Sequence, residues 1–305
     1  MSPTLPALRE YQLFGLKIRS EINLPELLPS HETGHPDVFI RIGSISGEVG
    51  GFGMEPDGDA LLFTVPDVAR YRIDRGSDIL VDLAAEVPER NVRLYLLGSA
   101  FGALLHQRGL LPLHANAIEI DGNAVAFMGA SGAGKSTLAA WFHDRGYSVI
   151  ADDICVIGFD ENGSARVTPG LPRLRLWKEA LDVMGRSATG LERSYVSDKF
   201  DKFDVPIDVK DAQTSDTVLK AVYLLDRADA FCVDRLSGLD AADAVFANTY
   251  RGAYLNQVDG HRAHWSAATE LVRNVPVFRL GRVWSTDLLH EQCERILALV
   301  RGSAE

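Results

Sequence analysis

One eight-residue segment, Gly129-Ala-Ser-Gly-Ala-Gly-Lys135-Ser136, constrains the fold of this chain more than any other feature, because it matches the phosphate-binding loop pattern G-x-x-x-x-G-K-[ST]. Glycines let consecutive backbone N–H groups point into one concavity around the phosphates. The lysine neutralises the β- and γ-phosphates, and the hydroxyl binds Mg²⁺. The pattern predicts a strand, this loop and a helix, in that order, in an α/β protein that binds ATP and Mg²⁺.

Both flanks of the loop fit that order. Residues 124–128 form a continuous apolar run typical of a buried strand, and residues 136–145 show a helical pattern that Gly146 ends. A glycine-rich turn in an unrelated α/β protein is the alternative, but it leaves the Lys-Ser pair at the helix start unexplained. The predicted nucleotide-binding residues are Gly129, Ala130, Ser131, Gly132, Ala133, Gly134, Lys135, Ser136 and Thr137.

A β-hairpin is predicted immediately before the loop. The Asp-Gly pair at residues 121–122 separates two apolar runs and favours a two-residue type I′ turn. Such a turn pairs Ile120 with Asn123 and places His114 opposite Gly129, beside the bound phosphates. His114 could instead cap or pack at the end of its strand, and both interpretations stay open.

An Asp-Asp pair ends the apolar, β-branched segment that follows the predicted helix, at residues 147–151. A strand reached through a strand-helix unit runs parallel to the first strand, so both carboxyl ends lie at one edge of the sheet, where ligands bind. Asp152 and Asp153 should therefore face the nucleotide. One carboxylate would hold Mg²⁺, and the other would accept a proton from an attacking hydroxyl. A surface Asp-Asp turn is the plain alternative.

The spacing of these residues resembles the HPr kinase/phosphorylase family, whose catalytic domain is akin to phosphoenolpyruvate carboxykinase. In that family a histidine precedes the loop lysine by 21 residues and an Asp-Asp pair follows it by 17 and 18, as do His114, Asp152 and Asp153 around Lys135. The resemblance implies an HPr kinase C-terminal-like P-loop catalytic domain in which Asp153, His114 and Lys135 are catalytic. It further implies that Asp153 is the base, that Ser136 and Asp152 bind the metal, and that His114 supports the phosphates or the base.

The chain departs from the bifunctional enzymes of that family after the Asp pair. Where those carry a Glu-Ile-Arg-Gly signature, residues 168–177 read Thr-Pro-Gly-Leu-Pro-Arg-Leu-Arg-Leu-Trp, so the resemblance does not extend to phosphorylase activity. The layout from residues 11–22 to 175–177 instead resembles the HPr-kinase-like proteins of peptide natural-product clusters. Some of these are tailoring kinases that phosphorylate the C-terminal serine of lasso-peptide precursors, which implies a serine-kinase role here.

Transfer of a phosphoryl group calls for cations besides the loop lysine. Arg173 and Arg175 alternate along one predicted strand and could project from the same face toward the site. Lys199 and Lys202 lie among phenylalanines in a second candidate segment. These four residues are predicted to contact phosphate or substrate, although either pair could belong to a solvated face.

The rest of the sequence predicts the domain organisation and argues against two classes of partner. Strand-like runs separated by Gly, Pro and Asp predict a small antiparallel β-rich unit over residues 1–90, before a catalytic domain over residues 91–305. The net charge of -11 and the pI near 5.2 oppose binding to a nucleic-acid backbone. With no apolar stretch long enough for a membrane and no signal-peptide pattern, a cytoplasmic location is expected.

The sequence therefore predicts an ATP-dependent kinase that phosphorylates a serine hydroxyl of a peptide or protein. The resemblance implies the C-terminal serine of a lasso-peptide precursor as the acceptor. An HPr-type carrier protein, a small-molecule hydroxyl and a non-catalytic nucleotide-binding scaffold are the alternatives. The paired Asp favours the enzyme, because a pure nucleotide binder needs no second carboxylate at the γ-phosphate. The resemblance also points to a homo-oligomer without fixing its symmetry.

Overall fold

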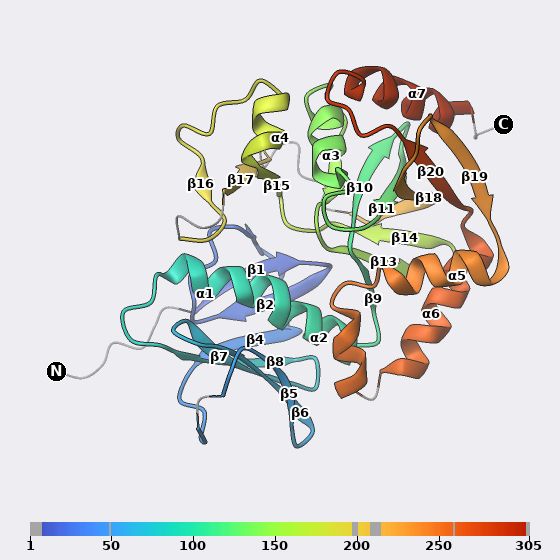
Figure 1. Ribbon diagram of the computed structural model, residues 1–305. Coiled ribbons are helices and arrows are strands. Elements are labelled where there is room, and N and C mark those ends of the chain that lie inside the picture. The colour runs from blue at the N-terminus through green and yellow to red at the C-terminus, as the bar shows by residue number, and fades with distance from the viewer. Residues whose placement is uncertain (1–7, 49, 197–200, 208–214, 259, 303–305) are drawn as a thin grey trace.

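The computed structural model describes residues 8–48, 50–196, 201–207, 215–258 and 260–302. These residues form a mixed α/β fold in which a β-rich N-terminal part precedes a larger part that carries the phosphate-binding loop (Figure 1). Three sheets occur within the described ranges, with eight, nine and three strands. The predicted fold class, an α/β protein with a β-rich N-terminal unit, is confirmed.

The first sheet has the strand order β3-β1-β2-β4-β8-β7-β6-β5. Its strands are β1 Arg9–Leu13, β2 Leu16–Ser20, β3 Leu28–Pro29, β4 Val38–Ile42, β5 Gly53–Asp57, β6 Ala60–Val65, β7 Ala69–Asp74 and β8 Asp78–Leu83. The pairs β2–β4 and β4–β8 are parallel, so the expectation of an antiparallel unit is wrong. Short turns impose antiparallel pairing from β5 to β8, whereas the longer connections on either side of β4 allow parallel pairing.

A helical segment lies across the first sheet and leads into the second (Figure 1). It consists of α1 Glu89–Tyr95, the π-helical turn η1 Leu96–Ala100 and α2 Phe101–Gln107. Its apolar stripe, which includes Phe101, belongs to the same hydrophobic core as the first sheet. Tyr71 on β7 ties the helix to that sheet by donating a hydrogen bond of 2.9 Å to the Val92 carbonyl oxygen.

The second sheet carries the phosphate-binding loop. Seven of its strands have the order β12-β10-β11-β18-β14-β13-β9, and β20 pairs with β18 and with β19. The strands are β9 Leu111–Leu113, β10 Ala115–Ile120, β11 Asn123–Met128, β12 Val149–Ala151, β13 Cys155–Phe159, β14 Ala165–Thr168, β18 Thr217–Arg227, β19 Cys232–Leu236 and β20 Val277–Arg282.

The hairpin of β10 and β11 has the predicted turn and register. Ile120 pairs with Asn123, and the pairing continues in step to Ala115 and Met128. The two turn residues, at positions 121 and 122, have φ values of 49° and 78°, as a type I′ turn requires. Because β10 is antiparallel to both β11 and β12, those two strands run in the same direction, and their carboxyl ends lie at one edge of the sheet.

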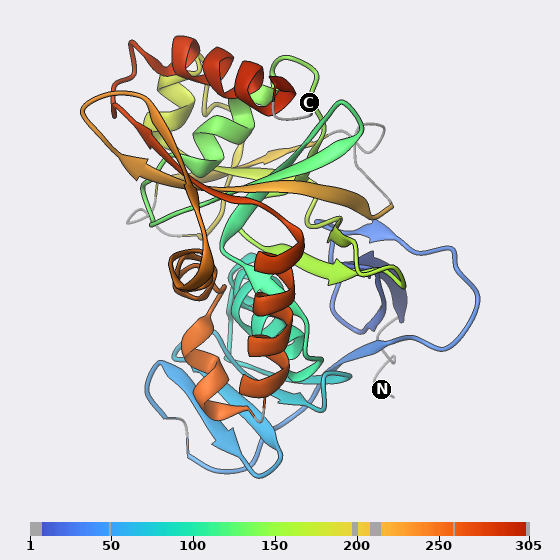
Figure 2. The same cartoon turned by 90° about the vertical axis from the view of Figure 1, so that its right-hand side faces the viewer.

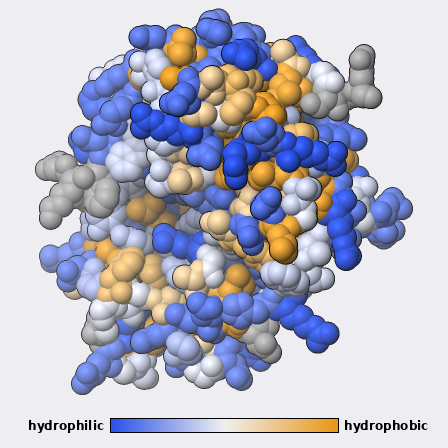
Figure 3. Space-filling view, turned by 45° about the vertical axis from the view of Figure 1, so that its right-hand side comes forward, coloured by the Kyte–Doolittle hydropathy of each residue, from blue (hydrophilic) through white to orange (hydrophobic). Residues whose placement is uncertain are grey.

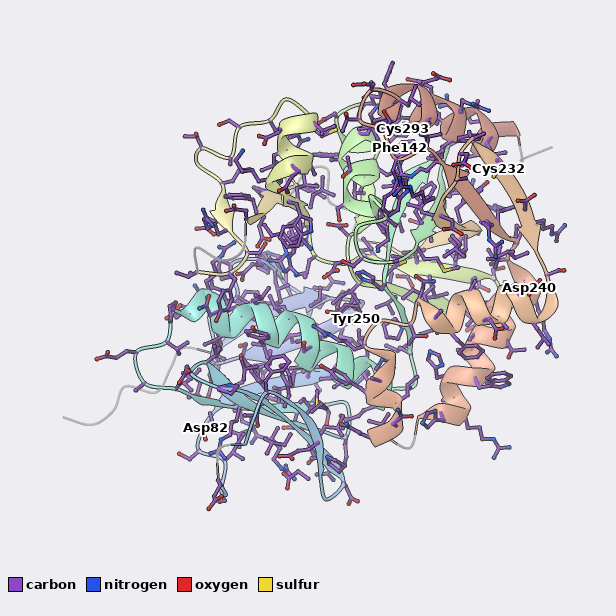
Figure 4. All side chains as sticks on the ribbon, in the orientation of Figure 1. Asp82, Phe142, Cys232, Asp240, Tyr250 and Cys293 are labelled. Carbon is purple, nitrogen blue, oxygen red and sulfur yellow. The ribbon has the colours of Figure 1, made fainter. Side chains whose placement is uncertain are left out.

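Helices cover both faces of the second sheet (Figure 2). They are α3 Lys135–His143 and α7 Leu289–Gly302 on one face, and α5 Gly238–Ala247 and α6 His261–Asn274 on the other, with the 3-10 helix η2 Gly252–Gln257 between α5 and α6. Alternate residues of β11 pack into opposite cores, Phe127 beneath α3 and α7 and Ala126 beneath α5 and α6. Burial on both faces explains the continuous apolar run of this strand. Figure 4 shows Phe142 and Cys293 together in the core between α3 and α7.

A third, three-stranded sheet lies beside the loop helix. It consists of β15 Arg173–Trp177, β16 Glu192–Arg193 and β17 Lys202–Pro206, and α4 Lys178–Val183 follows β15. In the described part of the chain, no helix is long and apolar enough to cross a membrane. Hydrophilic residues cover much of the face shown in Figure 3, with hydrophobic residues in small groups between them.

Candidate active site

The phosphate-binding loop runs from the end of β11 to the start of α3. Gly129, Gly132 and Gly134 have φ values of 152°, 84° and 81°, a region that residues with a side chain rarely adopt. A Cβ atom on Gly129 would also lie 2.9 Å from the Leu225 carbonyl oxygen on the neighbouring strand β18. The conformation of the loop therefore depends on glycine at these positions.

Two buried polar side chains from other strands hold the loop, and the sequence analysis missed both. Asn116 on β10 donates a hydrogen bond to the Lys135 carbonyl oxygen, and Arg282 on β20 donates one to the Ala133 carbonyl oxygen. A signal existed for Arg282, because it ends a strand that runs in the same direction as β11 and so reaches the ligand-binding edge of the sheet.

Lys135 lies in the first turn of α3, and its ammonium group is bound within the loop. Nζ donates hydrogen bonds to the carbonyl oxygens of Gly129 at 2.6 Å and Ala130 at 3.1 Å. Burial lowers the pKa of Lys135 to about 8, although the charges of Asp153 and Asp152 oppose the effect. Phosphate oxygens would replace neutral carbonyl partners with charged ones, so nucleotide binding favours the protonated amine.

ATP affinity is expected to fall as the pH rises above the Lys135 pKa of about 8. Below that pH the lysine of the free protein already carries its proton. Above it a proton must be taken up on binding, so the Kd for ATP should rise by up to about tenfold per pH unit. Calorimetric titrations across this range measure the effect. Lys135→Arg, whose guanidinium stays charged, is the control, and an equal slope in both proteins would contradict the assignment.

Asp152 follows β12 and is buried behind the loop hydroxyl. Its Oδ1 accepts a hydrogen bond from Ser136 Oγ at 3.0 Å, and its Oδ2 accepts one from the Arg175 backbone N–H at 2.8 Å. Burial raises the pKa of Asp152, and the charge of Asp153 acts in the same direction. A cation bound to this carboxylate would offset the cost of keeping it ionised away from water.

The Ser136 and Asp152 oxygens fit Mg²⁺. This ion prefers oxygen ligands, keeps several waters and is commonly held by one or two carboxylates together with substrate phosphates. The hydroxyl and the carboxylate already lie within hydrogen-bonding distance of each other, on the loop helix and the neighbouring strand end. Phosphate oxygens and water would complete the coordination of a metal ion at this point.

Asp153 has a backbone conformation that is unusual for an aspartate, with a φ of 75°. Such a residue costs about 1–3 kcal/mol and persists where its surroundings over-determine it. Arg175 Nη1 lies 3.3 Å from Oδ2, and His114 Nδ1 lies 3.4 Å from Oδ1. Burial opposes ionisation, but the charges of Arg175 and Lys202 outweigh it and keep the pKa of Asp153 below its usual value. Asp153 is thus ionised at neutral pH, as a proton acceptor must be.

His114 lies at the break between β9 and β10, where its backbone N–H donates to the Asn248 carbonyl oxygen at 2.7 Å. Its imidazole contacts Asp153, with Nδ1 3.2 Å from the Asp153 carbonyl oxygen. Burial and the Lys135 charge lower the pKa of His114, so the ring is neutral at pH 7 and Nδ1–H can serve as the donor. The side chain is placed to orient Asp153.

The two predicted arginines of β15 both bind Asp204, an acidic residue on β17 that the sequence analysis missed. Arg173 Nη1 lies 2.7 Å from Asp204 Oδ2, and Arg175 Nε lies 3.4 Å from Oδ1. Of the two, Arg175 also contacts Asp153. Arg90 reaches the same carboxylate from α1 at 2.9 Å. Asp204 thus fixes the guanidinium that holds Asp153.

Asp204→Ala is expected to destabilise the protein by about 3–5 kcal/mol, because it leaves buried arginines without their shared carboxylate. Glu192→Ala is the matched control, since Glu192 also pairs with Arg90 but its side chain is 76% exposed, against 10% for Asp204. The exposed pair should contribute about 0–1 kcal/mol. Urea unfolding measures both changes, and similar losses in the two variants would contradict the role of Asp204.

A cavity of about 430 Å³ opens in front of the loop and is called the nucleotide cavity here. Loop residues line this cavity together with Asp153, His114 and Lys202. Lys199, the other lysine predicted to contact phosphate or substrate, lies outside the described residues. Trp177 and Trp284, which are 43% and 46% exposed, also line the cavity, and Lys202 Nζ lies 5.5 Å from the centre of the Trp177 ring. Trp284 lies two residues after the end of β20. The sequence did not indicate it, because it is 155 positions from the first residue of the loop and no local pattern connects it to the site.

No family model and no curated protein matches this chain. Among solved structures, the chain is similar to the HPr(Ser) kinase/phosphatase from Coxiella burnetii, with a TM-score of 0.36 and 14% sequence identity over 63% of this chain and 95% of that chain. A similarity at this level carries no argument about function.

Proposed function

We propose that this protein is an ATP-dependent kinase that transfers the γ-phosphoryl group to a serine hydroxyl of a peptide or protein. The observation that supports it is that two adjacent carboxylates have different bonding partners. Asp152 is bonded to the loop hydroxyl of Ser136, whereas Asp153 is held by Arg175 and His114 and lines the nucleotide cavity. Nucleotide binding without transfer requires only the first of these carboxylates.

Each residue of the site has its own role in the transfer. The acceptor oxygen forms a bond to the γ-phosphorus as the bond to the β–γ bridging oxygen breaks, ADP leaves, and Asp153 receives the hydroxyl proton. Lys135 and Lys202 stabilise the charge on the phosphoryl oxygens. Ser136 and Asp152 would hold Mg²⁺, which neutralises phosphate charge when it is bound. His114 and Arg175 keep the carboxylate of Asp153 oriented.

We further propose that the exposed indoles bind the nucleobase. Trp177 and Trp284 are large apolar side chains at the wall of a cavity that also holds the phosphate-binding loop. A purine stacked on either indole would lose contact with water on one face, as bases do on aromatic platforms in other nucleotide sites. In this proposal the phosphates bind at the loop and the base binds beside the two indoles.

The acceptor in this proposal is a serine hydroxyl. We propose the C-terminal serine of a lasso-peptide precursor, supported only by the sequence resemblance described above. An HPr-type carrier protein is the alternative acceptor with the same chemistry.

The decisive experiment incubates the purified protein with Mg-ATP and three acceptors, and searches for a phosphate adduct by mass spectrometry. The acceptors are a peptide that ends in serine, the same peptide ending in alanine, and an HPr-type carrier protein. An adduct on the serine peptide alone is the expected result. An adduct on the carrier alone would reverse the order of acceptors, and ATP binding without any adduct would favour a scaffold.

A further inference from the structure

A second cavity is lined by the same two side chains, Asp153 and His114, that line the nucleotide cavity. It has a volume of about 550 Å³ and lies between the first residues of the phosphate-binding loop and the segment 247–254. The two cavities share His114, Ser131 and Asp153 in their linings. A hydroxyl that enters through the second cavity would therefore meet Asp153 while ATP occupies the first.

We propose that the second cavity admits the phosphate acceptor, and that Arg251 binds a carboxylate carried by the acceptor close to the hydroxyl. This inference rests on the kinase function proposed above and adds the chemistry of the group that is recognised. An in-line transfer requires the attacking and leaving oxygens on opposite sides of the phosphorus. Two separate cavities that share Asp153 let ATP and the acceptor bind at the same time with the acceptor hydroxyl beside Asp153.

Hydrogen bonds to the Tyr250 backbone hold the wall of the second cavity in place. The Tyr250 N–H donates to the Pro112 carbonyl oxygen at 2.9 Å, and the Tyr250 carbonyl oxygen lies 2.8 Å from His106 Nε2. The Tyr250 ring packs on Gly102 of α2, where a Cβ atom would lie 2.9 Å from a ring carbon. Figure 4 shows Tyr250 between α2 and the second sheet. The residue that follows it is therefore held in a defined position.

Among the described residues, Arg251 is the one arginine or lysine in the lining of this cavity. It is exposed, its Cζ lies 5.7 Å from the centre of the Tyr250 ring, and no carboxylate within the described ranges forms an ion pair with it. The arginines of the neighbouring cluster, such as Arg173 and Arg90, are instead paired with Asp204. In a chain with a net charge of -11, an arginine left without an acidic partner beside the proton acceptor is available for an anion.

A carboxylate suits this guanidinium better than a nucleotide phosphate does. The planar donors of arginine match the two oxygens of a carboxylate in a bidentate arrangement. The nucleotide phosphates already have Lys135 and the loop N–H groups in the other cavity. Arg251 also has a φ of 52°, a conformation that costs stability and that the Tyr250 anchors maintain. The geometry thus points to an acceptor with a hydroxyl and a carboxylate close together, as at a chain end that terminates in serine.

The test compares three peptides of the same length as acceptors, with Mg-ATP as donor. One ends in a serine with a free carboxylate, the second ends in the same serine as a carboxamide, and the third is amidated and carries its serine next to an aspartate. The second removes the anion, and the third supplies it from a side chain instead of the chain end. Steady-state kinetics are measured for the wild type, Arg251→Ala, Arg251→Lys and the control Arg262→Ala, an exposed arginine on α6 outside both cavities.

The wild type should favour the free carboxylate over the carboxamide by about ten- to a hundredfold in KM. Arg251→Ala should remove this preference by raising KM for the free carboxylate alone, and Arg251→Lys should restore part of it. ATP affinity, measured separately by calorimetry, should be unchanged in both variants. Equal effects on all three peptides, or none, would overturn the assignment of Arg251. A preference for the aspartate peptide would show that Arg251 binds a side-chain carboxylate and not the carboxylate of the chain end. If the wild type binds ATP but transfers phosphate to none of the peptides, the inference about the acceptor is overturned. If the wild type does not bind ATP, the proposed kinase function itself is overturned.

Discussion

Asp153→Asn is expected to lower kcat by about 10²–10⁴-fold, the usual contribution of a positioned general base, while ATP binds with nearly unchanged affinity. The amide cannot accept the hydroxyl proton. It keeps the size of the side chain, and asparagine tolerates the left-handed conformation that Asp153 adopts with a φ of 75°. Initial-rate measurements with a phosphorylatable peptide give kcat, and calorimetric titration gives the Kd for ATP.

A control is needed, because a buried aspartate can support the structure as well as the chemistry. Asp240→Asn removes one carboxylate from an exposed position in the first turn of α5, outside the linings of both cavities, and should leave both kcat and the Kd unchanged. Arg175 retains Asp204 when Asp153 is neutralised, so the variant should still unfold cooperatively. Unchanged turnover in Asp153→Asn would refute its role as the base. Parallel losses of turnover, ATP affinity and stability would instead assign it a structural role.

The parts of the site that sequence could predict are those set by local rules. The Asp-Gly turn fixes a hairpin register over fourteen residues, and the observed pairing follows that register as far as Ala115 and Met128. The same register predicted His114 beside Gly129, the first residue of the loop, and His114 lines the cavity in front of the loop. The strand-helix-strand rule placed Asp152 and Asp153 at the correct edge of the sheet. The same rule applied to β20 would have found Arg282, because β20 also runs parallel to β18 and β11.

The parts that sequence could not predict depend on which distant segments meet. The alternation of apolar residues reports that a strand is half-buried but not whether its neighbour is parallel, which is why the parallel pairs around β4 were missed. Asp204 acquires its role only because β17 pairs with β15, where Arg175 lies opposite it. Arg251 reaches the second cavity because the segment before it bonds to the end of β9. No local sequence pattern encodes these long-range contacts.

Lys135→Ala is expected to lower kcat/KM for ATP by at least about 10²–10³-fold, comparable to the loss of one preorganised donor to a developing charge. The ammonium group has two tasks in the proposed cycle. In the structure it binds the carbonyl oxygens of Gly129 and Ala130, and in the complex it would neutralise phosphate charge. Alanine removes both, so ATP affinity and turnover should fall together, unlike in Asp153→Asn, where turnover alone falls.

The stability of Lys135→Ala separates a functional lysine from a structural one. A folded-state pKa lowered to about 8 means that burial disfavours the charged amine, so at neutral pH the protonated lysine opposes folding. That opposition is fully present below pH 8 and disappears as the pH rises through the unfolded-state pKa. Alanine abolishes it but also loses two hydrogen bonds to carbonyl oxygens and the burial of three methylene groups, so the opposing changes should leave the unfolding free energy at pH 7 little changed. Lys178→Ala, which removes an exposed lysine bonded to Asp182, is the matched control and should preserve both stability and ATP affinity. A large loss of stability in Lys135→Ala would assign the lysine to the fold, whereas a stable variant that cannot bind ATP identifies a charge retained for its ligand.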